Sequence, residues 1–598
     1  MSEPAPDPRE SYRRRLEARR ADLSALQRTD ARLSIVRLSI FLSAALLGWV
    51  VVVRSTVAWP WMLLPAGVFA AVAWAHDRVI RRRVAARRAV AFYEAGLARL
   101  DDRWSGTGTA GERFLDPAHP YAADLDLFGR GSLFELACTA RTRVGEGTLA
   151  RWLLEPAAPA EIRRRQQAVR ELAPALDLRE DLARLGQEVQ ADDDPHGLAT
   201  WASAPPALSG RRRAWLGLLL AAGNVAAVVA WLSGTGGRWL LLAAAAGSAL
   251  FVFPSHARAK RVLHGASGPE HELELLAGVL GRLERERFHS PLLISLRSAL
   301  DAAGQPPSRR IAALARLVQL CDSRRNMMFA PLAALFLLGT QLALAIENWR
   351  AASGAAVARW LEVVGEIEAL CALASLAYER PGDAFPEIIE DGPCFAGESL
   401  GHPLLSEATC VRNDLSLDEP LRLLLVSGSN MSGKSTLLRT VGISAALAQA
   451  GAPVRARRLR LSPLAVGACL NVRDSLQQGT SHFFAEITRL RRIVDLGAGP
   501  RPLLFLLDEV LHGTNSHDRR IGAEALIREL MGRGAIGLVT THDLALAEIA
   551  EALGPLARNV HFEDNVRDGK IVFDYRLRPG VVRKSNALEL MRAVGLNV

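Results

Sequence analysis

One short segment restricts the fold of this chain more than any other. It reads Gly428-Ser429-Asn430-Met431-Ser432-Gly433-Lys434-Ser435 and fits the P-loop pattern G-x-x-x-x-G-K-[ST]. An apolar run over residues 421–426 predicts a buried strand before it, and residues 436–450 predict a helix after it. Only four of the 73 basic residues are lysines, and Lys434 stands where a compact ammonium reaches between two phosphates. The segment therefore predicts an α/β domain that binds a nucleoside triphosphate through backbone N–H groups and a helix N-terminus.

A second predicted strand ends in two adjacent carboxylates. Residues 503–507 are all apolar, and Asp508 and Glu509 follow them. After a P-loop, such a pair is typical of a Walker B site, where Asp508 and the Ser435 hydroxyl would hold Mg²⁺ and Glu509 would polarise the attacking water. Two solvated carboxylates at a strand end are the alternative, which the order of the two motifs disfavours. We therefore expect ATP hydrolysis, with ATP and Mg²⁺ as the ligands.

Further segments narrow the class of ATPase. A third strand-like run, residues 536–539, ends in Thr540-Thr541-His542-Asp543, the acidic pair continues into Gly513-Thr514, and residues 479–486 form a G-x-S-x-F-x-x-E segment. Together with Asn430-Met431 inside the first motif, these segments resemble the ATPase domain of the MutS family of DNA mismatch-repair proteins, an ABC-type ATPase. On this resemblance we place the ATPase domain at residues 396–598.

The resemblance implies roles for the matching residues. Glu509 and His542 would be catalytic, with His542 sensing the γ-phosphate, and Ser435 and Asp508 would hold the metal. Ser481 would be a signature serine that completes the site of a second copy, which implies a homodimer through the ATPase domains. Nucleotide binding would involve Gly428, Ser429, Asn430, Met431, Ser432, Gly433, Lys434, Ser435, Thr436 and His561.

Some of these assignments have alternatives. His561 would either stack on the adenine or serve a structural role. The chain also departs from the family at three positions: Cys410-Val411-Arg412 replaces an aromatic residue before Asn413, Arg519 replaces a glycine, and Asp543 replaces an aromatic residue.

A weaker resemblance covers the middle of the chain. Residues 127–133, 142–147 and 151–156 resemble the start of the MutS helical core, and residues 360–387 resemble its return into the ATPase domain. We assign the core to residues 126–210 and 257–395, after a helical connector over 77–125. Chance similarity is the alternative, because apolar positions at helical spacing occur in every helical core.

Four long apolar runs set the chain apart from that family. They cover residues 38–53, 57–75, 214–233 and 239–254, and each is close to the length that crosses a bilayer. A short turn joins each pair, which predicts transmembrane hairpins at residues 38–76 and 211–256. Arginines cluster on the outer flanks of both pairs, so the positive-inside rule places the basic arm 1–37 and the ATPase domain in the cytoplasm of a multi-pass cell-membrane protein. Four buried helices in a soluble core are the alternative.

Two further segments call for an interpretation. A fifth apolar run, residues 327–346, would place the ATPase domain outside the cell if it crossed the membrane, so we expect a buried core helix there. Phe92-Tyr93-Glu94 matches the Phe-x-Glu wedge of mismatch-recognition domains, but it lies in a predicted helix without the flanking strands. We therefore expect a membrane-anchored MutS variant that lacks the recognition domain.

The sequence thus predicts an α/β P-loop (ABC-type) ATPase domain at the C-terminus, joined to an all-α MutS-like core with two transmembrane helical hairpins. By resemblance, the function is ATP-dependent binding of mismatched or structured double-stranded DNA in repair or recombination. The alternative is a membrane ATPase or scaffold that has lost DNA binding. A transporter subunit is disfavoured, because residues 477–481 do not read L-S-G-G-Q. The six cysteines show no C-x-x-C pair, so they suggest neither a zinc site nor a disulfide framework.

Overall fold

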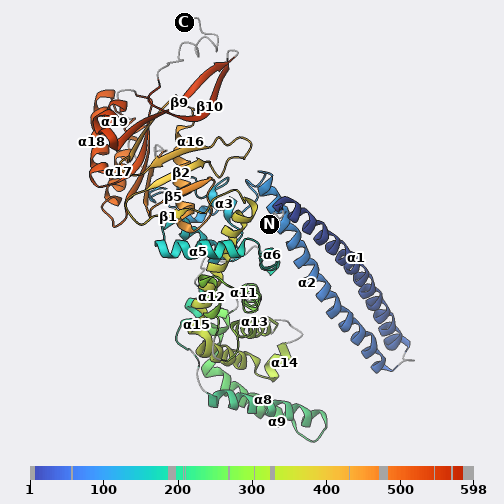
Figure 1. The fold of residues 1–598 in the computed structure, drawn as a ribbon. Helices are drawn as coiled ribbons and strands as arrows, with labels where there is room; N and C mark the ends of the chain where they lie inside the picture. Colours follow the sequence, from blue (N-terminus) through green and yellow to red (C-terminus); the bar gives the residue numbers. More distant parts are fainter. Residues whose placement is uncertain are drawn as a thin grey trace. The chain divides into compact units, whose positions relative to one another are not determined.

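Helices run through the whole chain, whereas the described strands all lie after residue 386 (Figure 1). The computed structural model describes residues 7–54, 58–185, 197–206, 208, 211–266, 270–301, 304–323, 330–429, 431–470, 482–512, 514–543, 546–567 and 570–582. The chain forms two units. The first consists of Met1–Thr139, Leu149–Arg184 and Leu370–Val598, and the second of Ala140–Thr148 and Leu185–Ala369.

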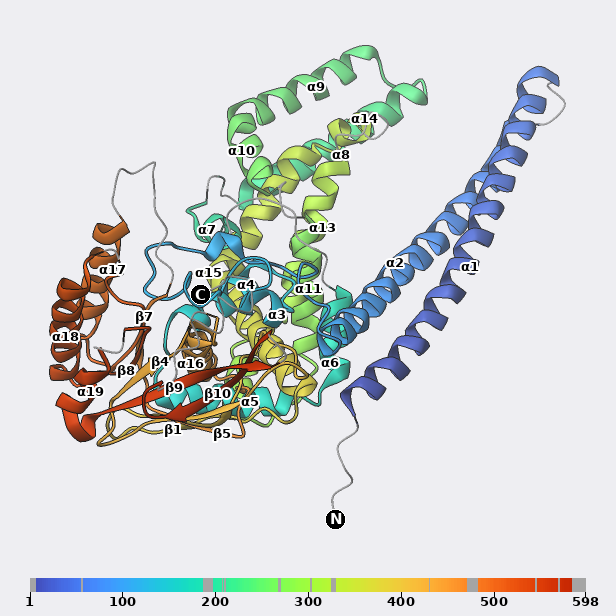
Figure 2. The same cartoon turned by 90° about the horizontal axis from the view of Figure 1, so that it is seen from above.

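A six-stranded sheet organises the C-terminal part of the first unit. Its strands are β4 (Leu423–Ser427), β6 (Ala465–Cys469), β7 (Leu503–Asp508), β8 (Ile536–Thr541), β9 (Ala557–Arg567) and β10 (Lys570–Pro579). Their order is β10-β9-β4-β8-β7-β6, and every neighbouring pair is parallel except β9 and β10. One face carries α16 (Lys434–Ala450), and the other carries α17 (His482–Leu496), α18 (Ser516–Gly532) and α19 (Ala547–Leu553) (Figures 1 and 2).

Burial on both faces explains why the central strands are apolar throughout. Leu425 and Phe505 pack in one cluster with Ile527 of α18. Leu506 faces the opposite way, toward α16, where a Cβ added at Gly442 would lie 2.8 Å from its Cδ1. Continuous apolar strands are typical of parallel sheets covered on both faces, and the three strands predicted at 421–426, 503–507 and 536–539 are confirmed as β4, β7 and β8. Because β8 lies between β4 and β7, the carboxyl ends of all three meet at one edge of the sheet.

A smaller sheet and several helices complete this part of the unit. The sheet has the order β1-β5-β2-β3, with β1 (Glu387–Ile388), β2 (Phe395–Leu400), β3 (Asn413–Leu417) and β5 (Arg458–Leu461). The short helices are α3 (Leu133–Ala137), α5 (Pro159–Leu172) and α6 (Leu176–Leu185). Thus β3 delivers Asn413, whose role in the candidate site is described below.

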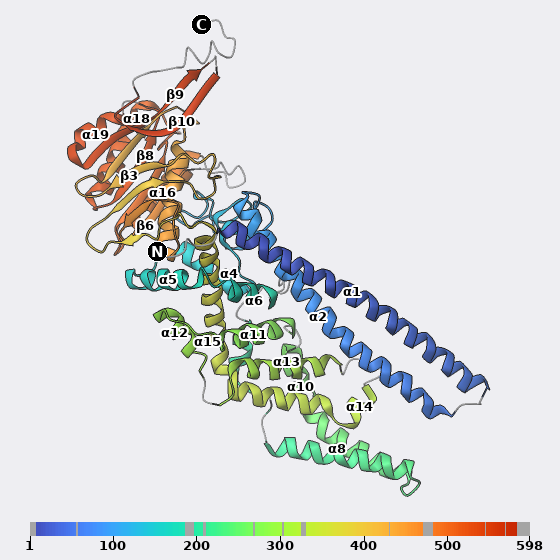
Figure 3. The same cartoon turned by 45° about the vertical axis from the view of Figure 1, so that its right-hand side comes forward.

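Two long helices, α1 (Pro8–Trp49) and α2 (Leu63–Leu100), form an antiparallel pair (Figures 2 and 3). Tyr12 of α1 packs against Phe92 and Tyr93 of α2, and the Tyr93 hydroxyl donates to Glu180 Oε2 at 2.5 Å. Phe92 and Tyr93 are therefore buried core residues of a helix pair. The predicted arm is helical from Pro8 onward. Within the connector predicted over 77–125, α2 ends at Leu100, Asp102 just beyond it adopts a left-handed conformation (φ 54°), and only a short 3₁₀ helix, Glu112–Phe114, follows.

The described part of the second unit contains helices only. They are α7 (Gly197–Ser203), α8 (Arg211–Leu232), α9 (Arg238–Val252), α10 (His256–Ala266), α11 (Glu270–Leu283), α12 (Pro291–Ser298), α13 (Pro307–Ser323) and α14 (Ala330–Leu335). Two more helices, α4 (Arg143–Leu154) and α15 (Leu338–Glu379), belong partly to each unit. The prediction of one continuous buried helix over 327–346 is wrong, because two helices lie there. Leu337, with φ 51°, separates α14 from α15. The buried character is confirmed in α15, where Ala343 and Ile346 are fully buried.

Within the described ranges, four helical segments are long and apolar enough to cross a membrane. They are Pro8–Val53, Pro60–Leu100, Arg212–Leu232 and Arg238–Leu263. In the most apolar stretch of each segment, at most 17% of the residues are buried. Large apolar side chains such as Leu46, Leu219 and Leu250 are 64%, 68% and 78% exposed. The fifth apolar run supplies no such segment in the part of it that the structure describes.

Candidate nucleotide-binding site

The glycine-rich loop connects the end of β4 to the start of α16. Its backbone turns through positive φ at Gly428 (155°), Met431 (72°) and Gly433 (104°). A Cβ at Gly428 would lie 2.7 Å from Ser432 Oγ, and one at Gly433 would lie 3.1 Å from Tyr575 Cδ1. Glycine is therefore required at both ends of the loop for conformation and for space. Asn430, which the sequence places inside the loop, lies outside the described residues.

Lys434 is the first residue of α16, and its side chain is only 5% exposed. Its ammonium donates to the carbonyl oxygens of Gly428 at 2.9 Å and Ser429 at 3.0 Å. It also lies 3.6 Å from Glu509 Oε1. A cation held between neutral carbonyls and one carboxylate can exchange these partners for phosphate oxygens, which bind ammonium groups more strongly.

Asp508 ends β7 and holds two hydroxyl groups. Ser435 Oγ donates to Asp508 Oδ2 at 2.5 Å, and Thr540 Oγ1 of β8 donates to Asp508 Oδ1. The same Thr540 oxygen accepts from the backbone N–H of Glu509 at 3.1 Å. A carboxylate beside a serine hydroxyl is an all-oxygen donor set, which is the type that Mg²⁺ prefers. Asp508 and Ser435 thus fit the expected metal site.

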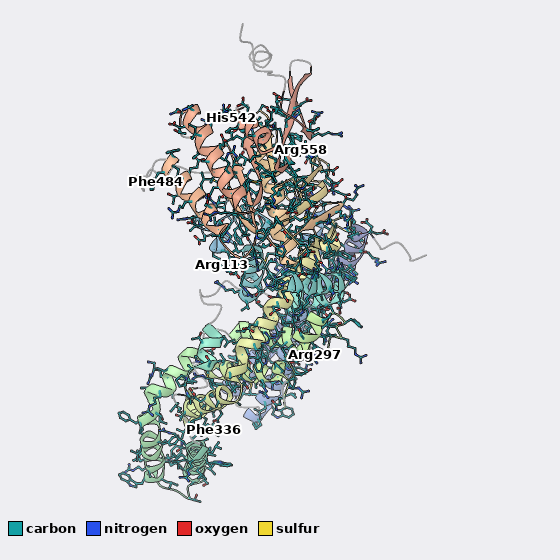
Figure 4. All side chains as sticks on the ribbon, turned by 60° about the vertical axis from the view of Figure 1, so that its left-hand side comes forward. Arg113, Arg297, Phe336, Phe484, His542 and Arg558 are labelled. Carbon is teal, nitrogen blue, oxygen red and sulfur yellow. The ribbon has the colours of Figure 1, made fainter. Side chains whose placement is uncertain are left out.

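Glu509 follows in a left-handed conformation (φ 46°). Its Oε1 lies 3.3 Å from Nδ1 of His542, which follows β8 and is labelled in Figure 4. The rings of His542 and His512 meet edge to face, with centroids 5.6 Å apart. The carboxylate therefore lies close to the Lys434 ammonium and the His542 imidazole.

Glu486 supports this corner from α17. It is 3% exposed, and its Oε1 accepts from the backbone N–H of Leu511 at 2.6 Å. Leu511 itself has φ 58°, so the buried carboxylate holds a strained turn directly after Glu509. The last position of the G-x-S-x-F-x-x-E segment therefore has a structural role that sequence reasoning left unassigned.

Two neighbouring cavities surround the loop. The larger, of about 470 Å³, is polar and is lined by Lys434, Ser435, Asp508 and Glu509 among others. The smaller, of about 300 Å³, is lined by His402, Cys410, Asn413, Leu437 and Phe562 among others. Gly433, Thr436 and Tyr575 line both cavities. The larger cavity is thus lined by charged groups, whereas the smaller is lined mainly by apolar and uncharged side chains.

Tyr575 is a residue that the sequence did not reveal. It lies in β10 with φ 53°, at a register shift between Phe573 and Leu577. The Asn413 side chain bridges this bulge: its Nδ2 donates to the carbonyl of Tyr575 at 3.0 Å, and its Oδ1 accepts from Leu577 N–H at 2.8 Å. Asn413 therefore fixes the bulge that turns Tyr575 into the two cavities. One sequence feature pointed in this direction. Because Cys410-Val411-Arg412 provides no aromatic residue before Asn413, an aromatic side chain at the site had to come from another part of the chain.

His402 keeps the smaller cavity uncharged. Burial, with the charges of Arg439 and Arg455 as further causes, lowers the pKa of His402 from 6.5 to about 4. Its imidazole is therefore neutral at physiological pH. A neutral cavity whose lining includes the rings of Phe562 and Tyr575 suits a base rather than a phosphate group.

The remaining predicted residues lie in different places. His561 is 7% exposed, its Nδ1 donates to the carbonyl of Gly580 at 3.0 Å, and it lines neither cavity, so the geometry favours its structural alternative. Cys410 lines the smaller cavity. Arg519 donates to the carbonyls of His512 and Thr514, both at 3.4 Å, and the Asp543 N–H donates to Thr541 Oγ1 at 2.9 Å. Ser481 lies outside the described residues.

Comparison with known proteins places this site in a family context. Residues 424–597 match the family model of MutS domain V. The chain is 33% identical over 259 residues to Endonuclease MutS2 of Thermus thermophilus. This alignment covers 41% of this chain and 32% of that protein. It is 34% identical over 237 residues to DNA mismatch repair protein MutS of Natronomonas pharaonis, covering 39% of this chain and 27% of that protein. A third relative, MutS of Nitratidesulfovibrio vulgaris, is 36% identical over 202 residues, with coverages of 33% and 22%.

These matches show that the C-terminal part of the chain is similar to MutS domain V and to the corresponding part of MutS and MutS2 proteins. The mixed sheet with helices on both faces is consistent with the α/β architecture of that domain. The chain spans about a third or less of the length of these three relatives.

Proposed function

We propose that this chain binds ATP with Mg²⁺ and hydrolyses it. One observation carries the proposal: Lys434, Ser435, Asp508 and Glu509 surround a single cavity of about 470 Å³ at the carboxyl edge of the sheet. A cation for the phosphates, an oxygen donor set for a metal and a second carboxylate beside them are the groups that phosphoryl transfer to water requires. The similarity to MutS domain V supports the same assignment.

The contacts of each group suggest its part in the reaction. Lys434 would leave the carbonyls of its own loop and pair with phosphate oxygens. Ser435 and Asp508 would hold Mg²⁺, which would offset the negative charge of the phosphates. That exchange would also separate Lys434 from Glu509, so the carboxylate could accept a proton from the attacking water. His542, 3.3 Å from the same carboxylate, would hold it in place.

Nucleotide binding tests the proposal directly. Isothermal titration of the purified full-length protein with ADP and Mg²⁺ should give one site per chain. Lys434→Ala should weaken binding by roughly 10²-fold, because about 3 kcal/mol is expected for the lost charge-assisted hydrogen bonds. Lys260→Ala is the matched control, since it removes an exposed lysine in α10. Equal affinities of the wild type and Lys434→Ala would contradict the proposal.

We also propose that the four apolar helical segments anchor the protein in a membrane as two hairpins, with the ATPase domain in the cytoplasm. Exposed tryptophans lie near the ends of the segments, where interfacial aromatics are common; Trp49, Trp61, Trp215 and Trp239 are all more than 50% exposed. A peripheral membrane protein would be released from membranes by alkaline carbonate, whereas release of an integral membrane protein requires detergent. Release by carbonate would therefore exclude the hairpins.

Double-stranded DNA is the macromolecular ligand that we propose from similarity to the mismatch-repair proteins. A salt titration of binding to homoduplex, mismatched and branched DNA tests it. Contacts to phosphates should weaken linearly with salt in logarithmic coordinates. Absence of binding at low salt would favour the alternative, a membrane ATPase without a DNA ligand.

A further inference from the structure

A second cluster of metal-ligating side chains lies beside the proposed Mg²⁺ site. Glu509, His512 and His542 each offer one ligand atom, and these atoms all lie within 4.8 Å of one another. The cluster differs in chemistry from Asp508 and Ser435, because two of its three donors are imidazoles. Mg²⁺ prefers oxygen donors, whereas Zn²⁺ binds imidazole and carboxylate together.

The backbone after β7 builds this cluster. Val510 and Leu511 are buried in the core cluster with α18, and the Leu511 N–H is held by Glu486. Left-handed conformations at Glu509 and Leu511 flank Val510 and turn the chain sharply. The turn brings His512 back over the end of the sheet, where its ring meets that of His542 at 5.6 Å. Buried neighbours thus fix the backbone just before His512.

The distance between Glu509 and His542 fits a small cation. Ligand bonds of about 2.0–2.1 Å in a tetrahedral site correspond to ligand–ligand separations of about 3.3 Å. Glu509 Oε1 and His542 Nδ1 are already 3.3 Å apart. His512 is exposed, so its side chain is free to close the remaining distance.

We propose that Glu509, His512 and His542 form a Zn²⁺ site that competes with hydrolysis. Zn²⁺ would take the Glu509 carboxylate and the His512 and His542 imidazoles as its three protein ligands, which leaves one position for water, as in other three-ligand zinc sites. Binding of the metal does not depend on the proposed ATPase activity, whereas its inhibitory effect rests on it. A carboxylate bound to Zn²⁺ cannot accept a proton from the attacking water, so the metal would block turnover reversibly.

One neighbouring charge opposes the metal and supplies a test. The Lys434 ammonium lies 3.6 Å from Glu509 Oε1, and like charges at this distance repel. Removal of that charge should therefore tighten metal binding, although the same variant loses nucleotide. The site predicts opposite effects for two neighbouring substitutions: His512→Ala weakens metal binding and Lys434→Ala strengthens it.

Cobalt substitution provides the measurement. Co²⁺ is titrated into the tag-free, nucleotide-free full-length protein, its visible ligand-field absorption is followed, and Zn²⁺ is then added to displace it. We expect one equivalent per chain, affinity at least ~10-fold lower in His512→Ala, and affinity largely retained in His512→Asp, which supplies a carboxylate ligand. His517→Ala is the matched control, because His517 is an exposed histidine of α18 outside the cluster.

The results separate the two proposals. Cobalt binding that is unchanged in His512→Ala, or no binding in the wild type, would overturn the metal site. If ATP is hydrolysed, Zn²⁺ should inhibit the wild type at concentrations at least ~10-fold lower than those needed for His512→Ala. Equal inhibition of both proteins would overturn the competition with hydrolysis. Cobalt binding as expected, in a protein that hydrolyses no ATP, would support the metal site and refute the proposed function.

Discussion

Removal of the Tyr575 ring should weaken nucleotide binding through the base rather than through the phosphates. The ring lies against Gly433 and lines both cavities. Stacking of a base on an aromatic side chain contributes about 1–3 kcal/mol. Since Tyr575 is still 43% exposed, we take about 2 kcal/mol, or roughly 30-fold in Kd for ADP. Tyr575→Phe keeps the ring and should stay within about 3-fold of the wild type.

Asn413 makes this prediction sharper, because it acts through Tyr575. Its two hydrogen bonds hold the bulge of β10, and together they contribute about 2 kcal/mol. If these hydrogen bonds affect binding only because they position the Tyr575 ring, Asn413→Ala should lower the affinity for ADP only slightly in a Tyr575→Ala background. Calorimetric titration of the two single variants and the double variant with ADP measures this coupling. Fully additive losses, or a Tyr575→Ala variant within 3-fold of the wild type, would refute this account of the base site.

Three further predictions concern stability, assembly and topology. Burial raises the pKa of Glu368 from 4.5 to about 7. Between these two pH values the Glu368 carboxyl is protonated in the folded state and ionised in the unfolded state. Stability should then fall by about 3 kcal/mol as pH rises from 4.5 to 7; urea titrations at pH 5 and pH 8 should show this fall in the wild type and not in Glu368→Gln. If Ser481 completes the partner's site, Ser481→Arg and Lys434→Ala should each be inactive alone, and ATPase activity should partly return when mixed dimers form. A thiol label at Gly236→Cys should react only from outside the cell and one at Val598→Cys only from the cytoplasm, so labelling of Val598→Cys from outside would reverse the proposed topology.

The sequence was sufficient for the part of the fold that is buried on both faces. Strands β4, β7 and β8 consist of apolar residues followed at once by polar ones, and parallel strands present their carboxyl ends at one edge. The meeting of Lys434, Asp508, Glu509 and His542 at one edge follows from that rule, and the structure places Lys434 and His542 3.6 Å and 3.3 Å from Glu509. Apolar runs that end in polar residues therefore predict both the parallel strands and the edge of the sheet at which the site lies.

Other features depend on contacts that no local pattern encodes. Tyr575 reaches the site through a bulge held by Asn413, which is 162 residues away in sequence. The break at Leu337 interrupts a run that is apolar throughout its neighbourhood, and hydropathy does not register a single left-handed residue. The approach of His512 to Glu509 arises from a turn with left-handed residues at Glu509 and Leu511, and no spacing of metal-ligand residues in the sequence indicates it.

The central claim is that Glu509 is the base in ATP hydrolysis at a site built by Lys434, Ser435 and Asp508. Its most direct test is a comparison of steady-state ATP turnover and equilibrium ATP binding in the wild type and Glu509→Gln. The account predicts turnover at least ~10²-fold slower with ATP affinity retained, because the amide preserves the shape of the side chain and leaves the metal ligands intact. Glu524→Gln, a substitution on the outer part of α18 where Glu524 pairs with Arg528 at 2.8 Å, is the control and should leave both quantities unchanged. Normal turnover in Glu509→Gln would remove Glu509 from the mechanism and contradict the account.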